Sequence, residues 1–194
     1  VNVALPSMRT GLGASPAAVQ WVVSGYALTF GLTLVTGGRL GDALGRRRMM
    51  LVGLTGFIAA SAAVGLAPSE GWAVAARLVQ GVAAGLLTPQ NSGLIQQLFR
   101  GPERGRAFGF FGLTVSVSAA LGPVLGGLII AALGPDLGWR AIFLVNVPIG
   151  LVAMVFVARL VPGPPARAPE TSTELDVPGA LLLGGAVLCV LLPL

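Results

Sequence analysis

Long runs of uncharged residues constrain this chain of 194 residues more than any other feature of its sequence. Five such runs, of 18 to 29 residues each, lie between charged residues. A helix needs about 20 apolar residues to cross the hydrocarbon core of a bilayer. The runs therefore predict five complete membrane-spanning helices, at 20–38, 49–68, 72–95, 107–132 and 141–160.

Composition supports a lipid-embedded chain and argues against an enzyme. Only 10% of the residues are charged, whereas soluble proteins carry about 25%. The chain contains no histidine and no lysine, so it lacks histidine metal ligands and the usual nucleophile–base pairs. We expect an all-α integral membrane protein with no catalytic residue, no metal site and no cofactor. Its basic residues lie in short clusters between apolar runs, which does not favour a nucleic-acid partner.

Both ends of the sequence resemble cut helices. The chain begins with valine, its first five residues are too short to span a bilayer, and its last apolar run has no exit loop. We therefore expect a bundle truncated at both ends. It would comprise the end of helix one through helix six at 1–160, a proline-rich cytoplasmic linker at 161–176, and part of helix seven at 177–194.

The arginines set the predicted orientation. Nine of them lie at the loops between helices two and three, four and five, and six and seven, whereas only Arg9 and Arg140 lie at the opposite ends. Loops rich in arginine and lysine stay on the cytoplasmic side. We expect a multi-pass protein of the cell (inner) membrane with those three loops in the cytoplasm.

Small residues recur every four positions along three of the predicted spans. Such a stripe forms one narrow helix face and lets two backbones approach closely, so ordinary helix packing accounts for most of it. The stripes consist of Gly25, Thr29, Thr33, Gly37 and Gly41; of Gly81, Gly85 and Pro89, in line with Arg77; and of Thr114, Ser118, Gly122 and Gly126.

Arg77 is the exception among the arginines, because it lies inside a predicted span. Placing it near the bilayer centre costs about 2.5–3.5 kcal/mol. One interpretation is an interfacial side chain that extends outward to water. The other is a side chain that points at a neighbouring helix and meets water, substrate, backbone or a residue of helix one. No acid lies within the five predicted spans to pair with it.

Three motifs occur in order along the chain. They are Gly38, Gly41, Asp42, Gly45, Arg46 and Arg47 in the loop after helix two; Arg77, Gln80 and Gly81 in helix four; and Ser118, Gly122, Pro123, Gly126 and Gly127 in helix five. Together they resemble the major facilitator superfamily, in particular its fourteen-helix branch of drug:proton antiporters. Residues 1–6 and 139–150 are similar to the end of helix one and to the helix 5–6 region of that branch. Ala43 and Ser118 depart from the family pattern.

The resemblance implies a major-facilitator-type N-terminal helical bundle and proton-coupled export of drugs or other amphipathic small molecules by alternating access. It implies a conformational latch in the first motif, proton coupling in the second and antiport in the third. The proton-carrying acid would lie on helix one. The partners would be a small-molecule substrate, protons, lipid and the C-terminal half of the transporter, and the proton gradient would supply the energy.

Several alternatives remain open at this point. A proton-coupled importer or a metabolite exporter on the same fold is the first, and a non-transporting membrane sensor or scaffold is the second. Asp42 could simply be solvated. Aromatic and polar residues could line a substrate cavity or pack between helices, namely Tyr26, Phe30, Gln90 and Asn91.

Overall fold

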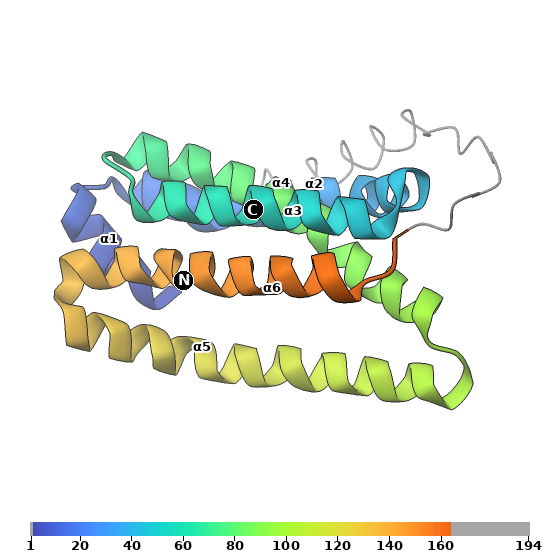
Figure 1. Ribbon diagram of the computed structural model, residues 1–194. Coiled ribbons are helices and arrows are strands. Elements are labelled where there is room, and N and C mark those ends of the chain that lie inside the picture. Colours follow the sequence, from blue (N-terminus) through green and yellow to red (C-terminus); the bar gives the residue numbers. More distant parts are fainter. Residues whose placement is uncertain (1, 164–194) are drawn as a thin grey trace.

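The computed structural model describes residues 2–163, and every element in that range is a helix (Figure 1). The expected partial helix at 177–194, and the expected linker beyond residue 163, lie outside the described residues. In chain order the elements are η1 (Asn2–Ala4), α1 (Leu5–Leu12), α2 (Pro16–Leu44), α3 (Arg46–Gly65), α4 (Glu70–Leu98), α5 (Gly101–Leu144) and α6 (Asn146–Leu160).

A helix lies at each of the five predicted spans, although α3 ends at Gly65, three residues before the predicted end at 68. Within residues 2–163, four stretches are long and apolar enough to cross a membrane, and the last of them is the 60-residue stretch Gly101–Leu160. That stretch doubles back, so the first part of α5 runs antiparallel to α6 in Figure 1. The turn occurs at Gly134, whose φ of 77° suits glycine, and Pro135 follows it. The sixth span therefore begins earlier than the predicted residue 141.

The first helical segment is longer than the sequence predicts. Residues 1–6 were expected to close helix one, whereas α1 continues to Leu12 and is followed by Gly13, with φ of 59°. Ser15 then starts α2, because its Oγ accepts the backbone N–H of Ala18 at 3.2 Å. The backbone N–H of Ser15 itself donates to Glu70 Oε2 at 2.7 Å. This bond joins the beginnings of α2 and α4.

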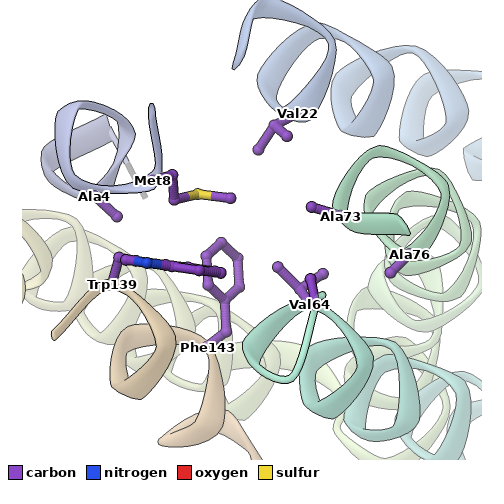
Figure 2. Packing of buried hydrophobic residues seen from close by; sticks show 9 residues of the cluster. Ala4, Met8, Val22, Val64, Ala73, Ala76, Trp139 and Phe143 are labelled. Carbon is purple, nitrogen blue, oxygen red and sulfur yellow. The ribbon is translucent and has the colours of Figure 1, made fainter. Parts of the chain in front are cut away.

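The apolar core lies at the end of the bundle where α1 turns into α2 and α3 turns into α4. Figure 2 shows Trp139 and Phe143 side by side at its centre, with Met8 and Val64 beside them. Trp139 is 0% and Phe143 is 1% exposed. Both follow the turn at Gly134, so that turn returns the chain into the core.

The α2–α4 interface confirms that two of the small-residue stripes are packing faces. A Cβ atom added to Gly37 would lie 2.5 Å from the carbonyl oxygen of Gly85. One added to Gly81 would lie 2.1 Å from Thr29 Oγ1 and 2.5 Å from the carbonyl oxygen of Tyr26. The Thr29 hydroxyl also lies 2.9 Å from the carbonyl oxygen of Leu78 on α4. The two backbones therefore touch, which no larger residue would permit.

We predict that Gly37→Ala destabilises the bundle. Its new methyl group would press on the α4 backbone, which cannot move aside as a flexible side chain can, and overpacking of this kind costs about 1–3 kcal/mol. Gly112→Ala on α5 is the matched control, because a Cβ there meets nothing within 4 Å. Thermal unfolding in detergent measures both, and equal midpoints would contradict the prediction.

Candidate functional site

Arg77 lies in α4, seven residues after Glu70, and its side chain is only 5% exposed. Its Nε donates to the carbonyl oxygen of Val22 on α2 at 2.9 Å. Its Nη1 donates to Gln80 Oε1, one turn further along α4, at 2.6 Å. The side chain therefore points into the bundle, not outward to an interface, and the backbone is one of its partners.

Two aromatic rings complete the surroundings of the guanidinium group. Its Cζ lies 4.1 Å from the centroid of the Tyr26 ring on α2 and 5.7 Å from that of Phe143 on α5. A guanidinium over an aromatic face is attracted by the negative face of the ring. Tyr26 in turn stacks on Phe30, with 6.1 Å between the ring centroids. The charge is thus held by neutral groups from three helices.

Gln80 continues this hydrogen-bond network to α3. Its Nε2 donates to Ser61 Oγ at 2.5 Å, and both side chains are essentially unexposed, at 1% and 0%. The sequence motif identified Arg77 and Gln80 but not Ser61. A serine within a largely apolar span was the only available signal, and it did not indicate which neighbour the hydroxyl would meet.

No carboxylate pairs with Arg77 within the described residues 2–163. Asp42 Oδ1 and Arg46 Nη2 form an ion pair, at 2.5 Å, near the other end of the bundle. An arginine keeps its positive charge at physiological pH. A buried arginine without a carboxylate partner can therefore still attract an anion.

The loop between α2 and α3 is docked on the neighbouring helices by its arginines. The Arg46 side chain lies directly over Gly93 of α4, where an added Cβ would overlap its guanidinium group. Arg47 donates from Nη2 to the carbonyl oxygen of Ala158 on α6. Gly45 allows the tight turn with φ of 94°. The Asp42 side chain remains 51% exposed, so one oxygen stays available beside Arg46.

Gln90 differs from its expected place in a substrate cavity. It is 0% exposed and donates from Nε2 to the carbonyl oxygens of Gly37 and Leu86, both at 2.8 Å. Its Oε1 has no hydrogen-bond partner, and a Cβ added to Gly41 would lie 2.0 Å from that oxygen. Gln90 therefore links α4 to α2 in this structure instead of facing an open space. The cavity role of Tyr26, Phe30 and Asn91 stays a prediction.

The helix-five motif packs less closely than expected against the described helices. Gly126 is buried, and a Cβ there would lie 3.6 Å from Ile142 Cδ1 and 3.9 Å from Val3 Cβ. Gly122 and Gly127 have no atom within 4 Å of an added Cβ, and Ser118 and Pro123 are exposed. The close backbone approach expected along this small-residue stripe is thus not made with the part of the chain that is described. Its antiport role stays a prediction.

Solved structures of membrane transporters share this arrangement of helices. A peptide transporter (POT, E310Q mutant, in complex with sulfate) superposes with a TM-score of 0.71 at 20% identity, over 98% of this chain and 42% of the other. The proton:xylose symporter XylE gives a TM-score of 0.66 at 17% identity, over 96% of this chain and 44% of the other. At these identities the likeness shows the fold alone.

Curated relatives are more similar in sequence. The tetracenomycin C resistance and export protein of Streptomyces glaucescens is 40% identical over 98% of this chain and 34% of its own length. The cephamycin export protein CmcT of Amycolatopsis lactamdurans is 43% identical over 94% of this chain and 37% of its own length. The chain thus spans about a third of the length of these relatives.

The family comparison agrees with the fold and with the relatives. Residues 1–192 match the family described as Major Facilitator Superfamily, which leaves only the last two residues outside the match. That family consists of multi-pass membrane proteins that bind and transport small molecules, and it is not normally enzymatic. This chain belongs to the Major Facilitator Superfamily.

Proposed function

We propose that this chain forms the N-terminal bundle of a proton-coupled transporter that exports drugs or other amphipathic small molecules. The single observation that carries the proposal is the buried guanidinium group of Arg77, held by neutral partners and unpaired with any carboxylate of the described helices. A buried charge inside a membrane span is costly and marks a functional site by default. The names of the relatives, which are export and resistance proteins, support the direction of transport.

In this proposal Arg77 acts on a proton-carrying acid and does not carry the proton itself. A guanidinium keeps its proton, but it stabilises the ionised form of a carboxylate that comes close to it. Release of a proton from that acid would then depend on the distance between the two groups, which alternating access changes. The acid would belong to helix one, to which the segment Asn2–Leu12 also belongs.

The arginine distribution supports a membrane orientation that we include in the proposal. The loop between α2 and α3 and the loop between α4 and α5 would face the cytoplasm of a cell (inner) membrane, together with the segment after α6. Asp42 would then lie at the cytoplasmic end, where its exposed oxygen could contact a helix N-terminus or an arginine of the C-terminal half. Such a contact, made in one state only, would bias alternating access.

The proposal predicts proton-driven efflux that depends on Arg77. In inverted vesicles containing the protein in its full reading frame, a proton gradient should drive uptake of a cationic dye, and a protonophore should abolish it. Arg77→Ala should reduce this coupled transport about 100-fold or more, because coupling loses its fixed charge. Arg9→Ala, which removes an exposed arginine, is the matched control. Retention of uphill export by Arg77→Ala would contradict the assignment.

Neutralising the predicted latch should slow transport without unfolding the bundle. In Asp42→Asn the amide cannot form the 2.5 Å ion pair with Arg46 or attract a helix N-terminus as an anion does. We expect the initial rate of dye efflux to fall about tenfold at equal membrane expression. Glu103→Gln, at the exposed start of α5, should leave the rate unchanged. If Asp42→Asn exports dye as fast as the unmodified protein does, Asp42 is a solvated residue and not a latch.

A bulky residue in the helix-five motif should abolish coupled efflux. In Gly126→Leu the side chain would enter the space beside Val3 and Ile142, where a Cβ alone is already in van der Waals contact. Gly109→Leu on the same helix meets open space and controls for the added apolar volume. Proton-driven dye uptake in vesicles measures both variants. Equal uptake by the two would count against a packing role for the motif.

A further inference from the structure

Ser61 is the one member of the Arg77 network that lies on α3. Its side chain is fully buried, and its Oγ accepts the hydrogen bond from Gln80 Nε2 at 2.5 Å. Gln80 Oε1 accepts from Arg77 Nη1 at 2.6 Å. The chain of contacts therefore runs from α3 through α4 to the guanidinium group, while Arg77 Nε is held separately by the Val22 carbonyl on α2.

The order of donors and acceptors in this chain is set by chemistry. A guanidinium group can only donate hydrogen bonds, so the oxygen of the Gln80 amide must face Arg77. The amide nitrogen is then forced to the opposite side, where it needs an acceptor. Ser61 Oγ is the acceptor that it finds, and a side chain without an oxygen at that position would leave a buried N–H without a partner.

We propose that Ser61 is a positioning residue for proton coupling, because its hydroxyl oxygen fixes the Gln80 amide in the orientation that holds the Arg77 guanidinium. This inference rests on the proposed function of Arg77 in coupling, and extends it to a helix that the sequence motif does not include. Ser61 touches neither substrate nor proton and acts only through Gln80.

Loss of the Ser61 hydroxyl would loosen one of the two hydrogen-bonded anchors of Arg77. A buried amide N–H without a partner is costly, so the Gln80 side chain would turn to find another acceptor. Its oxygen would then leave Nη1. The Val22 carbonyl and the Tyr26 ring would still hold the other side of the guanidinium group. The guanidinium group would remain inside the bundle, but it would occupy more than one position.

The test compares Ser61→Ala with Thr55→Ala in the protein expressed in its full reading frame. Thr55 lies on the same helix, is exposed, and its hydroxyl donates to the Leu51 carbonyl within α3, so its loss controls for removal of a hydroxyl. The first readout is the rate at which phenylglyoxal modifies Arg77, measured by peptide mass spectrometry. The second is the pH profile of dye efflux, and thermal unfolding checks that stability is matched.

We expect Ser61→Ala to raise the modification rate of Arg77 about tenfold and to shift the pH profile of efflux, while Thr55→Ala changes neither. Gln80→Met should produce the same increase, and the double variant should add nothing further, because Ser61 acts through Gln80. Ser61→Cys keeps a weaker acceptor at the same place and should give an intermediate rate. It replaces Ser61→Ala if that variant is not recovered from membranes.

Each outcome bears on the inference. An unchanged Arg77 modification rate in Ser61→Ala or Ser61→Cys, or effects of Ser61→Ala and Gln80→Met that simply add, would overturn it. A raised rate with an unshifted pH profile would also overturn it, since positioning would then not matter to coupling. If the unmodified protein shows no proton-driven efflux, the proposed function fails, and a raised rate would support only the structural link between Ser61 and Arg77.

Discussion

The close approach of α2 and α4 is the constraint on which the other contacts of this bundle depend. Gly37 and Gly85 bring the two backbones together, and Gly81 does the same one turn away from Arg77. Lipid gives helices no hydrophobic reason to associate, so such backbone contact has to provide the attraction. It also brings the Val22 carbonyl within 2.9 Å of Arg77 Nε, so that the packing face and the buried charge form one arrangement.

The two ends of the bundle are held by different kinds of interaction. At one end, Trp139 and Phe143 fill the apolar core (Figure 2), and Arg140 donates from Nη1 to the carbonyl oxygens of Gly65 and Ala67, at 3.1 and 2.9 Å. At the other end, Arg46 covers Gly93 and Arg47 binds the last turn of α6. Carbonyl oxygens at a helix end lack partners of their own, so arginines satisfy them.

Much of the fold could be predicted from the spacing of charges, because a bilayer excludes charge over a fixed thickness. A helix lies at each of the five predicted spans, and two of the three small-residue stripes proved to face each other. The turn at Gly134 lies between the predicted spans 107–132 and 141–160, as expected, although the chain is helical again before residue 141. Arg77 and Gln80 could be identified from their motif. Ser61 could not, because its role depends on a hydrogen-bond partner that lies on another helix.

The sequence by itself determined that the chain lies in lipid, where its helices run, and that one arginine is placed inside a span. Periodicity and charge are local properties, and each can be read along a single helix. Only the tertiary structure decided what Arg77 meets, that Gln90 is buried against Gly37, and that most of the helix-five motif is open among the described residues. These outcomes depend on the relative rotation and spacing of different helices. Contacts among all of them together set that geometry, and no single segment encodes it.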